Sequence, residues 1–547
     1  MVQTIRIATI DVEPRCVDLL RNEITKLRVA FEAGSLPFGA LRAIRTLHYA
    51  SMVVFADHRY DPALVIEVNF DGRAGPFWAE FEAAIGTPLR EMLRCCKRPG
   101  EPVGALFDRV TEPGSEMPLA PFLEAISMSP AAWHLGNRGL SRARIEAEAE
   151  VFLAARDAVA PPNTFANASA IHQHVRKKLL RDHPCLRAPP PPQISRFDDL
   201  REWFWAWFFG WAIFLVLEAP GALLTFIIPP PEPVPAWVPN WIAPSAIIPA
   251  GILVLFIAVF LWILRGQWRK IELAKRGVEP PVKRPKDSTP LRVWVFLGIE
   301  FATSLGVLAA SCWLLRGWKL PPDWRTLGST VVVGVAGGIL IAQLVLARLR
   351  QIEERDPWQN APPLAEPVER EIAALEDKSP QNHMASLVQI KPGALRSVLT
   401  LLGLAGLSLV MRVEGRARQG YLVNVRTIHF AHLTLLNNRS RLLFLSNFDG
   451  TWSNYLTDFI EKVQIPLTLV WNPGVGFPRT LFYVLEGVTH GRLFRAWKRR
   501  SMAPSLLWFC AYPELSVEQI WRQSRIADGL RRPHPTEEEA KLWARDL

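Results

Sequence analysis

At 547 residues the chain is too long for a single hydrophobic core, so several domains are expected. Nearly half of its residues (49%) are apolar, and its formal net charge is +11. The basic residues concentrate beside apolar runs, a pattern that indicates a membrane protein and argues against a nucleic-acid-binding protein. The six cysteines form no Cys-x-x-Cys pair and no evident disulfide framework, so neither a metal site nor disulfides are predicted.

The first 158 residues are predicted to form an α+β domain. "TIRIATIDV" alternates like a half-buried strand, and "CVDLLRNEITKLRVAFEA" has the spacing of an amphipathic helix. "LRAIRTLHYASMVVFAD" and "ALVIEVNF" then predict two further strands. The N-terminus lacks the apolar core of a signal peptide, so no cleaved leader is expected.

A basic, proline-rich linker is predicted at 159–201, followed by four membrane-spanning helices within 202–348. A span takes about 20 apolar residues, and four runs are long enough. They are Trp203 to Ile228, Ile242 to Leu264, Val293 to Leu315 and Leu327 to Ala347. Of the 21 tryptophans, 12 lie between Trp203 and Trp324, as the aromatic belts of membrane interfaces would place them.

Loop charges predict how these spans are oriented. The loop at 265–292 holds nine Lys or Arg against three acids, whereas the first loop, "PPPEPVPAWVPNW", holds no Lys or Arg. Positively charged loops stay inside, so we expect a multi-pass protein of the inner or plasma membrane with both termini in the cytoplasm. Glu218 and Glu300 lie within the spans, where a carboxylate either relays ions or protons, or is neutral and hydrogen-bonded.

After a linker at 349–382, residues 383–530 predict a second α+β domain, and residues 531–547 a tail. "HMASLVQI" reads as a strand, "GALRSVLTLLGLAGLSLVMR" as a helix, and "VRTIHFAHLTLL" with "RLLFLSNF" as a hairpin. The helix at 394–412 is apolar enough for a fifth span. Because the corresponding helix at 16–33 is amphipathic, we expect both in the soluble part.

The two domains share motifs, which predicts an internal repeat. "NFDG" occurs at 69–72 and again at 447–450. "RTLHYA" at 45–50 corresponds to "RTIHFA" at 426–431, and the downstream Trp133 corresponds to Trp508. An even number of spans places both copies in the same compartment, where they can pair.

Each copy follows the order strand–helix–strand–strand, which is typical of the split βαβ or ferredoxin-like pattern. Two such repeats in one chain resemble the dimeric α/β barrel superfamily, in which two sheets pack around a pocket. Within it, the chain is most similar to the dye-decolourising peroxidase and chlorite dismutase branch, over residues 1–158 and 383–530. The resemblance implies an α+β fold of two ferredoxin-like repeats that form an intramolecular barrel. It does not extend to the transmembrane segment, which the apolar runs predict between the two repeats. The resemblance also implies a haem cofactor.

Two histidines and two aspartates are candidate site residues. His48 and His429 lie mid-strand beside small residues, where a histidine either binds haem in the barrel pocket or is a satisfied core residue. Asp71 and Asp449 match the Asp-Gly of the peroxidase family's Gly-x-x-Asp-Gly motif, whose first glycine is absent here. Such an aspartate either assists peroxide cleavage or caps the following helix.

Arg479 is a further candidate, because it ends the Gly/Pro-rich loop "NPGVGFPRT". It would supply a fixed charge beside His429, or belong to a structural turn. One functional hypothesis is therefore a haem-binding peroxidase-like protein. The alternative is a non-catalytic, membrane-anchored protein whose barrel holds a small apolar ligand or a partner. A transporter is disfavoured, since the spans hold few polar residues and show no repeat.

Overall fold

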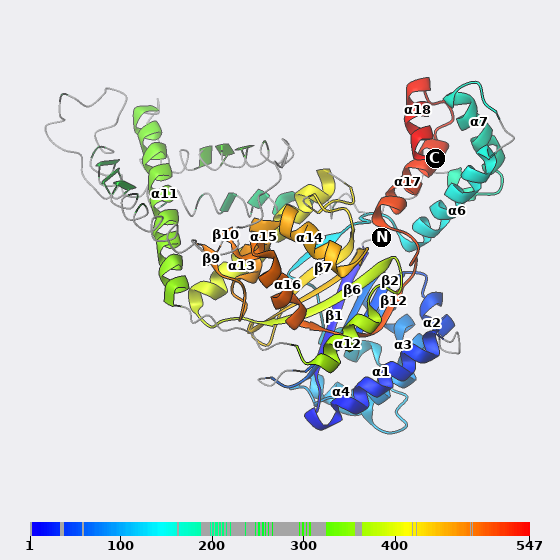
Figure 1. Ribbon diagram of the computed structural model, residues 1–547, viewed down its shortest axis with the longest axis horizontal. Coiled ribbons are helices and arrows are strands. Elements are labelled where there is room, and N and C mark those ends of the chain that lie inside the picture. Colours follow the sequence, from blue (N-terminus) through cyan, green and yellow to red (C-terminus); the bar gives the residue numbers. More distant parts are fainter. Residues whose placement is uncertain are drawn as a thin grey trace. The chain divides into compact units, whose positions relative to one another are not determined.

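The computed structural model describes residues 3–187, apart from 33–37, 57–59 and 161–163. It also describes residues 324–547, apart from 356–363, 418, 423, 482 and 484, and only scattered residues between 188 and 323. The chain divides into two compact units (Figure 1), which are treated separately below. Unit 1 contains Met1–Asp199, Ala361–Phe459 and Arg495–Leu547, and unit 2 contains Leu200–Asn360 and Ile460–Phe494.

Unit 1 is built on two five-stranded antiparallel sheets, which confirms the expected α+β class. In spatial order the first sheet holds β12 (Ser505–Cys510), β2 (Leu47–Phe55), β3 (Ala63–Asp71), β1 (Gln3–Asp11) and β4 (Ser127–Met128). The second holds β11 (Met502–Ala503), β6 (Gln381–Gln389), β8 (Arg441–Asp449), β7 (Ile428–Leu436) and β5 (Ala132–Leu135). Strands β2 and β3 are mainly apolar and are buried at every position, including polar residues such as His48 and Glu67.

The two sheets repeat one pairing scheme. Strand β1 pairs with β3, and β6 pairs with β8, at positions that are 378 residues apart along the chain. The pairing of β2 with β3 shifts register beside His48, and that of β7 with β8 shifts beside His429. We call residues at the same register position of the two sheets counterparts.

Each half of the chain gives one strand to the other sheet. Strand β12 pairs with β2, and β5 pairs with β7. The short strands just before them, β11 and β4, pair instead with β6 and β1. The chain therefore crosses between the sheets at Pro504 and at residues 129–131. This exchange joins the two halves through backbone hydrogen bonds.

The inner faces of the sheets pack against each other. One buried hydrophobic cluster draws on both sheets, with Ile7 and Val65 from the first and Ala385, Leu443 and Leu445 from the second. Apolar burial of this kind is the main force holding two sheets together. Polar side chains interrupt this interface at two places, which form the candidate sites described below.

Helices cover the outer faces. Those over the first sheet are α1 (Val17–Glu32), α2 (Phe38–Ala43), α3 (Ala74–Leu93), α4 (Val103–Thr111) and α5 (Ala120–Ile126). In α1, Leu20, Ile24 and Leu27 recur at helical spacing and are buried against this sheet. Helix α13 (Ala394–Ala417) contacts β5 in the second sheet, so the helix at 394–412 belongs to unit 1 as expected.

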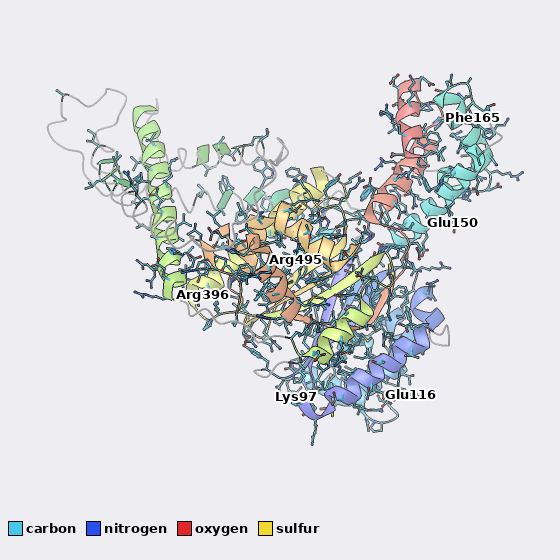
Figure 2. All side chains as sticks on the ribbon, in the orientation of Figure 1. Lys97, Glu116, Glu150, Phe165, Arg396 and Arg495 are labelled. Carbon is cyan, nitrogen blue, oxygen red and sulfur yellow. The ribbon has the colours of Figure 1, made fainter. Side chains whose placement is uncertain are left out.

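The remaining helices of unit 1 include α12 (Glu366–Leu375), α14 (Trp452–Lys462) and α16 (Gly491–Arg500). A helical arm is formed by α6 (Arg142–Val159), α7 (Ala168–Leu179), α17 (Val517–Arg531) and α18 (Glu537–Asp546), which share one hydrophobic cluster. Figure 2 labels Glu150 and Phe165 on this arm, where the Phe165 ring lies 5.2 Å from that of His174. Nε2 of His172 donates a hydrogen bond to the Gly529 carbonyl at 2.9 Å.

Unit 2 contains α11 (Trp324–Arg355), α15 (Gln464–Trp471) and the two short strands β9 (Thr480–Leu481) and β10 (Leu485–Glu486). Among the described residues, one helix is long and apolar enough to cross a membrane, Val332–Arg355 within α11. It covers much of the fourth expected span. The first three expected spans, with Glu218 and Glu300, lie outside the described residues.

Candidate functional site

The two sequence-predicted His–Asp pairs occupy counterpart positions at the ends of their sheets. Nε2 of His48 lies 3.1 Å from Oδ1 of Asp71, and Nε2 of His429 lies 2.8 Å from Oδ1 of Asp449. Both imidazole rings are fully buried. The strand shift beside each histidine is therefore accompanied by the same side-chain pair in both halves.

Neither aspartate caps the helix that directly follows it, in contrast to the expected structural role. Helix α3 begins after Arg73, whose side chain makes no capping bond. Oδ2 of Asp71 instead accepts from the backbone N–H of Arg142 at 2.9 Å, at the start of α6. Oδ2 of Asp449 accepts from the N–H of Val517 at 2.9 Å, at the start of α17. A carboxylate suits a helix N-terminus because the first N–H groups lack partners within the helix.

Aromatic rings fill the space around both histidines, where a pocket was expected. Nδ1 of His48 lies 2.7 Å from Oη of Tyr512, and its ring lies 5.6 Å from that of Phe430. The His429 ring lies 5.6 Å from the Tyr49 ring and 6.2 Å from the Tyr512 ring. An axial haem ligand needs a ring nitrogen directed at the iron. In His48 both nitrogens already have neighbours, and His429 is enclosed by rings, so these positions do not fit an axial ligand.

Arg479 belongs to unit 2, whereas both His–Asp pairs belong to unit 1. Its side chain is exposed, and its carbonyl oxygen accepts from the backbone N–H of Gly487 at 3.1 Å. The surrounding residues form a turn, in agreement with the structural alternative for this loop. A role for Arg479 beside His429 stays a prediction.

A second polar cluster, which the sequence analysis missed, surrounds Glu67 in the middle of β3. Its carboxylate is fully buried. Oε1 accepts from Nδ2 of Asn69 at 2.8 Å and from Nδ2 of Asn447 at 3.1 Å. Oε2 accepts from the Ser51 hydroxyl at 2.9 Å and is 2.8 Å from Nε2 of His383. A carboxylate has about four acceptor positions, so these partners satisfy it.

The surroundings keep Glu67 ionised. Burial raises its pKa, but the imidazoles of His432 and His383, together with the hydrogen bonds from His383 and Asn69, outweigh burial and lower the pKa to about 2. Burial lowers the pKa of His432 to about 4, so that its ring is neutral at pH 7. A carboxylate can only accept hydrogen bonds, and therefore Nε2 of His383 carries a proton.

His383 connects Glu67 to Ser505. With the proton on Nε2, Nδ1 is free to accept from the Ser505 hydroxyl, whose oxygen is 2.6 Å away. A hydroxyl, an imidazole and a carboxylate linked in this order form the arrangement that activates serine as a nucleophile. Here Nδ1 of the histidine faces the serine, whereas in the trypsin-like arrangement Nε2 does so.

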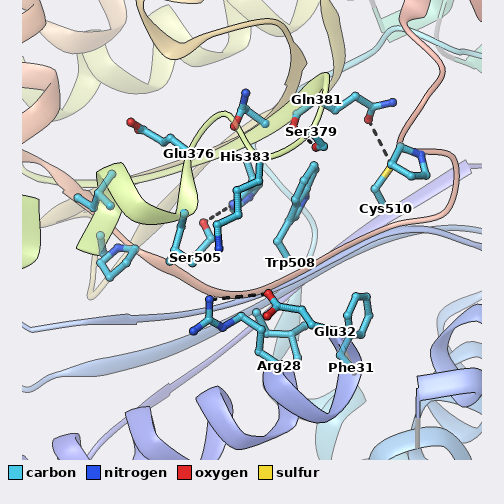
Figure 3. A pocket seen from close by; sticks show the side chains of 18 of the residues that line it. Arg28, Phe31, Glu32, Glu376, Ser379, Gln381, His383, Ser505, Trp508 and Cys510 are labelled. Atoms are coloured by element: carbon cyan, nitrogen blue, oxygen red, sulfur yellow. Dashed lines mark hydrogen bonds and ion pairs between the residues drawn. The ribbon is translucent and has the colours of Figure 1, made fainter. Parts of the chain in front are cut away.

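Ser505 and His383 open onto a pocket with a cavity volume of about 250 Å³ (Figure 3). Strands β6 and β12 form one side of it, and helices α1 and α12 contribute further residues. Trp508 and Leu375 supply apolar surface, and Arg28 supplies a charged group. Ser505 is thus half-buried at the pocket, while the His383 side chain is only 1% exposed and Glu67 lies wholly inside the protein.

Ser505 occupies an unusual position in the backbone. It follows Pro504, where the chain leaves the second sheet, and it begins β12, an edge strand of the first sheet. The pairing of β12 with β2 shifts between Ser505 and Leu507, so Leu506 is an extra residue. Such bulges are frequent next to active sites because they redirect a side chain. The bulge and the crossover together bring Ser505 towards His383.

Within the part of the chain that the structure describes, the relay occurs once. At the counterpart positions, Glu67 is replaced by Leu445, His383 by Ile5, and Ser505 by Pro130. None of these replacements can donate or accept a proton through its side chain. The pairing scheme of the sheets therefore does not require the relay.

One sequence signal for this site was available. Glu67 interrupts the apolar strand "ALVIEVNFD", and a charged residue is seldom fully buried unless it is paired. His432 lies in the similarly apolar strand "IHFAHLTLL", whereas His383 lies in the more polar strand "QNHMASLVQ". Ser505 gave no such signal, because a serine after a proline is ordinary at the start of an edge strand.

No family model, curated protein or solved structure matched the chain. The roles assigned below therefore rest on the geometry of this chain and on general chemistry.

Proposed function

We propose that unit 1 is a serine-type acyl-transfer enzyme that hydrolyses esters. Ser505 is the nucleophile, His383 the general base and Glu67 the carboxylate that orients the base. The observation that carries this proposal is the continuous hydrogen-bonded path from the pocket to the buried carboxylate, 2.6 Å from serine to histidine and 2.8 Å from histidine to glutamate.

The reaction has two halves. In the first, the Ser505 oxygen attacks the ester carbonyl carbon, and Nδ1 of His383 takes the hydroxyl proton. The proton then passes to the leaving alkoxide oxygen, the alcohol departs, and an acyl ester of Ser505 remains. In the second half a water molecule attacks this ester, His383 takes a proton from the water and returns it to the serine oxygen, and the carboxylic acid leaves.

Glu67 contributes without contacting the substrate. Its hydrogen bond from Nε2 holds the imidazole in the tautomer whose Nδ1 accepts a proton. When His383 becomes positively charged, the adjacent carboxylate stabilises that charge. The three neutral side chains that also bind Glu67, from Ser51, Asn69 and Asn447, fix the carboxylate in place.

The experiment is active-site labelling of the full-length chain with a fluorophosphonate, which phosphonylates an activated serine oxygen with loss of fluoride. Mass spectrometry of the peptide containing Ser505 should show the adduct. Ser505→Ala and His383→Gln should abolish labelling, and Glu67→Gln should slow it by at least 10-fold, since loss of the orienting carboxylate lowers turnover strongly in serine enzymes.

The matched control is Ser379→Ala. Ser379 lines the same pocket, but its hydroxyl donates to the Gln381 carbonyl at 2.6 Å and takes no part in the relay. This variant should label like the unmodified protein. Labelling that persists in Ser505→Ala, or an absence of labelling in a correctly folded protein, would leave a non-catalytic binding role for the pocket.

The haem-binding peroxidase hypothesis, the first of the two functions expected from the sequence, has a direct test. The visible spectrum of the purified protein should show a Soret band if haem is bound. The enclosed positions of His48 and His429 lead us to expect none.

We further propose that the two sheets arose by duplication as ferredoxin-like repeats and form an intramolecular dimeric α/β barrel. The repeated pairing scheme and the exchange of β5 and β12 support this. Residues 1–158 expressed alone should be unstable or should self-associate, because β5 would lack its partner strand. A stable monomer of that fragment would count against the pairing.

We also propose four membrane spans between 202 and 348, with both termini cytoplasmic and unit 1 beside the inner or plasma membrane. The loop charges and the apolar helix Val332–Arg355 support this arrangement. In intact cells, tags at 265–292 and at both termini should be protected from an external label, and a tag at 229–241 should react. Reaction at either terminus would overturn the topology.

A further inference from the structure

We propose that the pocket selects esters whose acyl part carries a carboxylate, which Arg28 binds while Ser505 attacks the ester carbonyl. This inference rests on the proposed acyl-transfer function and names its substrate class. The carboxylate would be part of a short, dicarboxylic acyl group.

Cations dominate the charged lining of the pocket. Arg28, Arg42 and Lys378 line it, together with two acids, Glu32 and Glu376. One of the acids, Glu376, is engaged by the guanidinium of Arg499, a residue outside the lining. The uncompensated charge of the pocket is therefore positive, which favours an anionic ligand.

Arg28 is the cation best placed to bind a ligand. It lies on α1, and its side chain is 24% exposed. Its Nε is buried and has no hydrogen-bond partner among the described atoms. Nη1 is 3.9 Å from Oε1 of Glu32, which is longer than a hydrogen bond. Because this ion pair is long, the guanidinium at the pocket wall can also take a carboxylate through two parallel N–H···O bonds.

The shape of the pocket restricts the acyl group. Figure 3 shows Arg28 and Glu32 on the side formed by α1, and His383 with Ser505 on the side formed by the strands. At about 250 Å³ the cavity is below the usual range of roughly 300–1,000 Å³ for sites of drug-sized ligands. A short acyl chain that bridges the two sides fits this volume, and the Trp508 ring supplies an apolar wall for its methylene groups.

The test compares two esters of similar size on the full-length chain, neutral p-nitrophenyl butyrate and anionic mono-p-nitrophenyl succinate. We expect kcat/KM to be at least 10-fold higher for the succinate ester. Arg28→Gln should lower the succinate-to-butyrate ratio by at least 10-fold. Lys26→Gln is the matched control, because Lys26 lies on the same helix, is exposed and pairs with Glu23 outside the pocket.

A second measurement separates this inference from the proposed function. Binding of free succinate to the Ser505→Ala protein, followed by calorimetry, should weaken at least 10-fold in the Ser505→Ala, Arg28→Gln double variant. If Ser505 reacts with fluorophosphonate but the enzyme shows no preference for the anionic ester, the carboxylate inference fails and the acyl-transfer function stands. If succinate binding depends on Arg28 but Ser505 never reacts, the pocket binds carboxylates without catalysis. Succinate binding that does not depend on Arg28 overturns the inference.

Discussion

The two polar regions between the sheets differ in how the two halves of the chain use them. The His–Asp pairs at 48 and 71 and at 429 and 449 occur in both halves with nearly the same geometry. The Glu67–His383–Ser505 relay draws on both halves and is not duplicated, because apolar residues stand at the counterpart positions. A feature that occurs twice serves what the halves share, namely the fold. A feature without a second copy serves something that the fold does not need.

The same comparison explains why "NFDG", the motif that stands out most in the sequence, has a structural role. "NFDG" is conspicuous because it occurs twice, and its aspartates fasten helices α6 and α17 to the sheets through the N–H groups of Arg142 and Val517. Glu67 is not repeated, yet it is a fully buried charge. Duplication directs attention to what is structurally conserved between the halves, whereas chemistry is found where the halves diverge.

Replacing Glu67 by leucine, its counterpart at 445, should have the largest effect. It leaves the buried donors around the carboxylate without an acceptor, which typically costs about 3–5 kcal/mol of unfolding free energy. The further substitution His383→Ile places at 383 the residue type of its counterpart, Ile5, and removes one of the hydrogen-bond donors to Glu67. The double variant should therefore lose less stability than the sum of the single variants, by about 1–3 kcal/mol. Chemical denaturation measures this, and simple additivity would show that Glu67 and His383 are not coupled.

The polar cluster around Glu67, which includes His432, should also dominate the acid sensitivity of the protein. His432 has a pKa of about 4 in the folded state against 6.5 for an unperturbed histidine, so the unfolded chain takes up a proton first as pH falls. The contribution of His432 to the free energy of unfolding amounts to about 3 kcal/mol. It is fully present above pH 6.5 and is lost as the pH falls from 6.5 to 4. The lowered pKa of Glu67 adds a second loss, between pH 4.5 and 2.

The measurement for that prediction is the free energy of unfolding as a function of pH. Replacing His432 by serine, the residue type at its counterpart position 51, should flatten the pH dependence of the unfolding free energy between pH 6.5 and 4. The burial of His134 also lowers the pKa of that residue, to about 3, so part of the slope should remain. An unchanged slope in His432→Ser would mean that this ring is not buried in its neutral form.

The His–Asp pairs should give smaller and equal effects. Asp71→Ala and Asp449→Ala each remove an acceptor from a helix N-terminus and from an imidazole, at a cost of about 2 kcal/mol. Asparagine keeps an acceptor oxygen, so Asp→Asn should cost less at either position. Thermal or chemical denaturation of the four variants compares the two halves directly. A loss of ester hydrolysis in Asp→Asn, with stability unchanged, would restore a catalytic role for that aspartate.

Several elements of the fold could be predicted because their signals are local. Alternation predicted strands β1 and β3, and helical spacing predicted α1, whose observed bounds are Val17–Glu32. The comparison with that helix correctly assigned the apolar helix α13 to unit 1. By contrast, the apolar stretch "LFYVLEG" has the composition of one strand, but it contributes only to the short strands β9 and β10, because it makes a turn between them.

The candidate site was predicted in part. The sequence placed each histidine in a strand and each aspartate at a strand end, and the structure brings each pair together. It could not show that the aspartates reach helices that begin about 70 residues later, at Arg142 and Val517. Nor could it show that Tyr512, from the other half of the chain, fills the space beside His48.

By itself, the sequence determined the order of strands and helices, the repeated motifs and the apolar runs, because each depends on residues within a few positions of one another. Only the tertiary structure decided that β5 and β12 change sheets, and thereby that Ser505 meets His383. Glu67 and His383 are 316 residues apart in the chain. Their contact depends on which sheet faces pack together, and no local pattern of side chains specifies that choice.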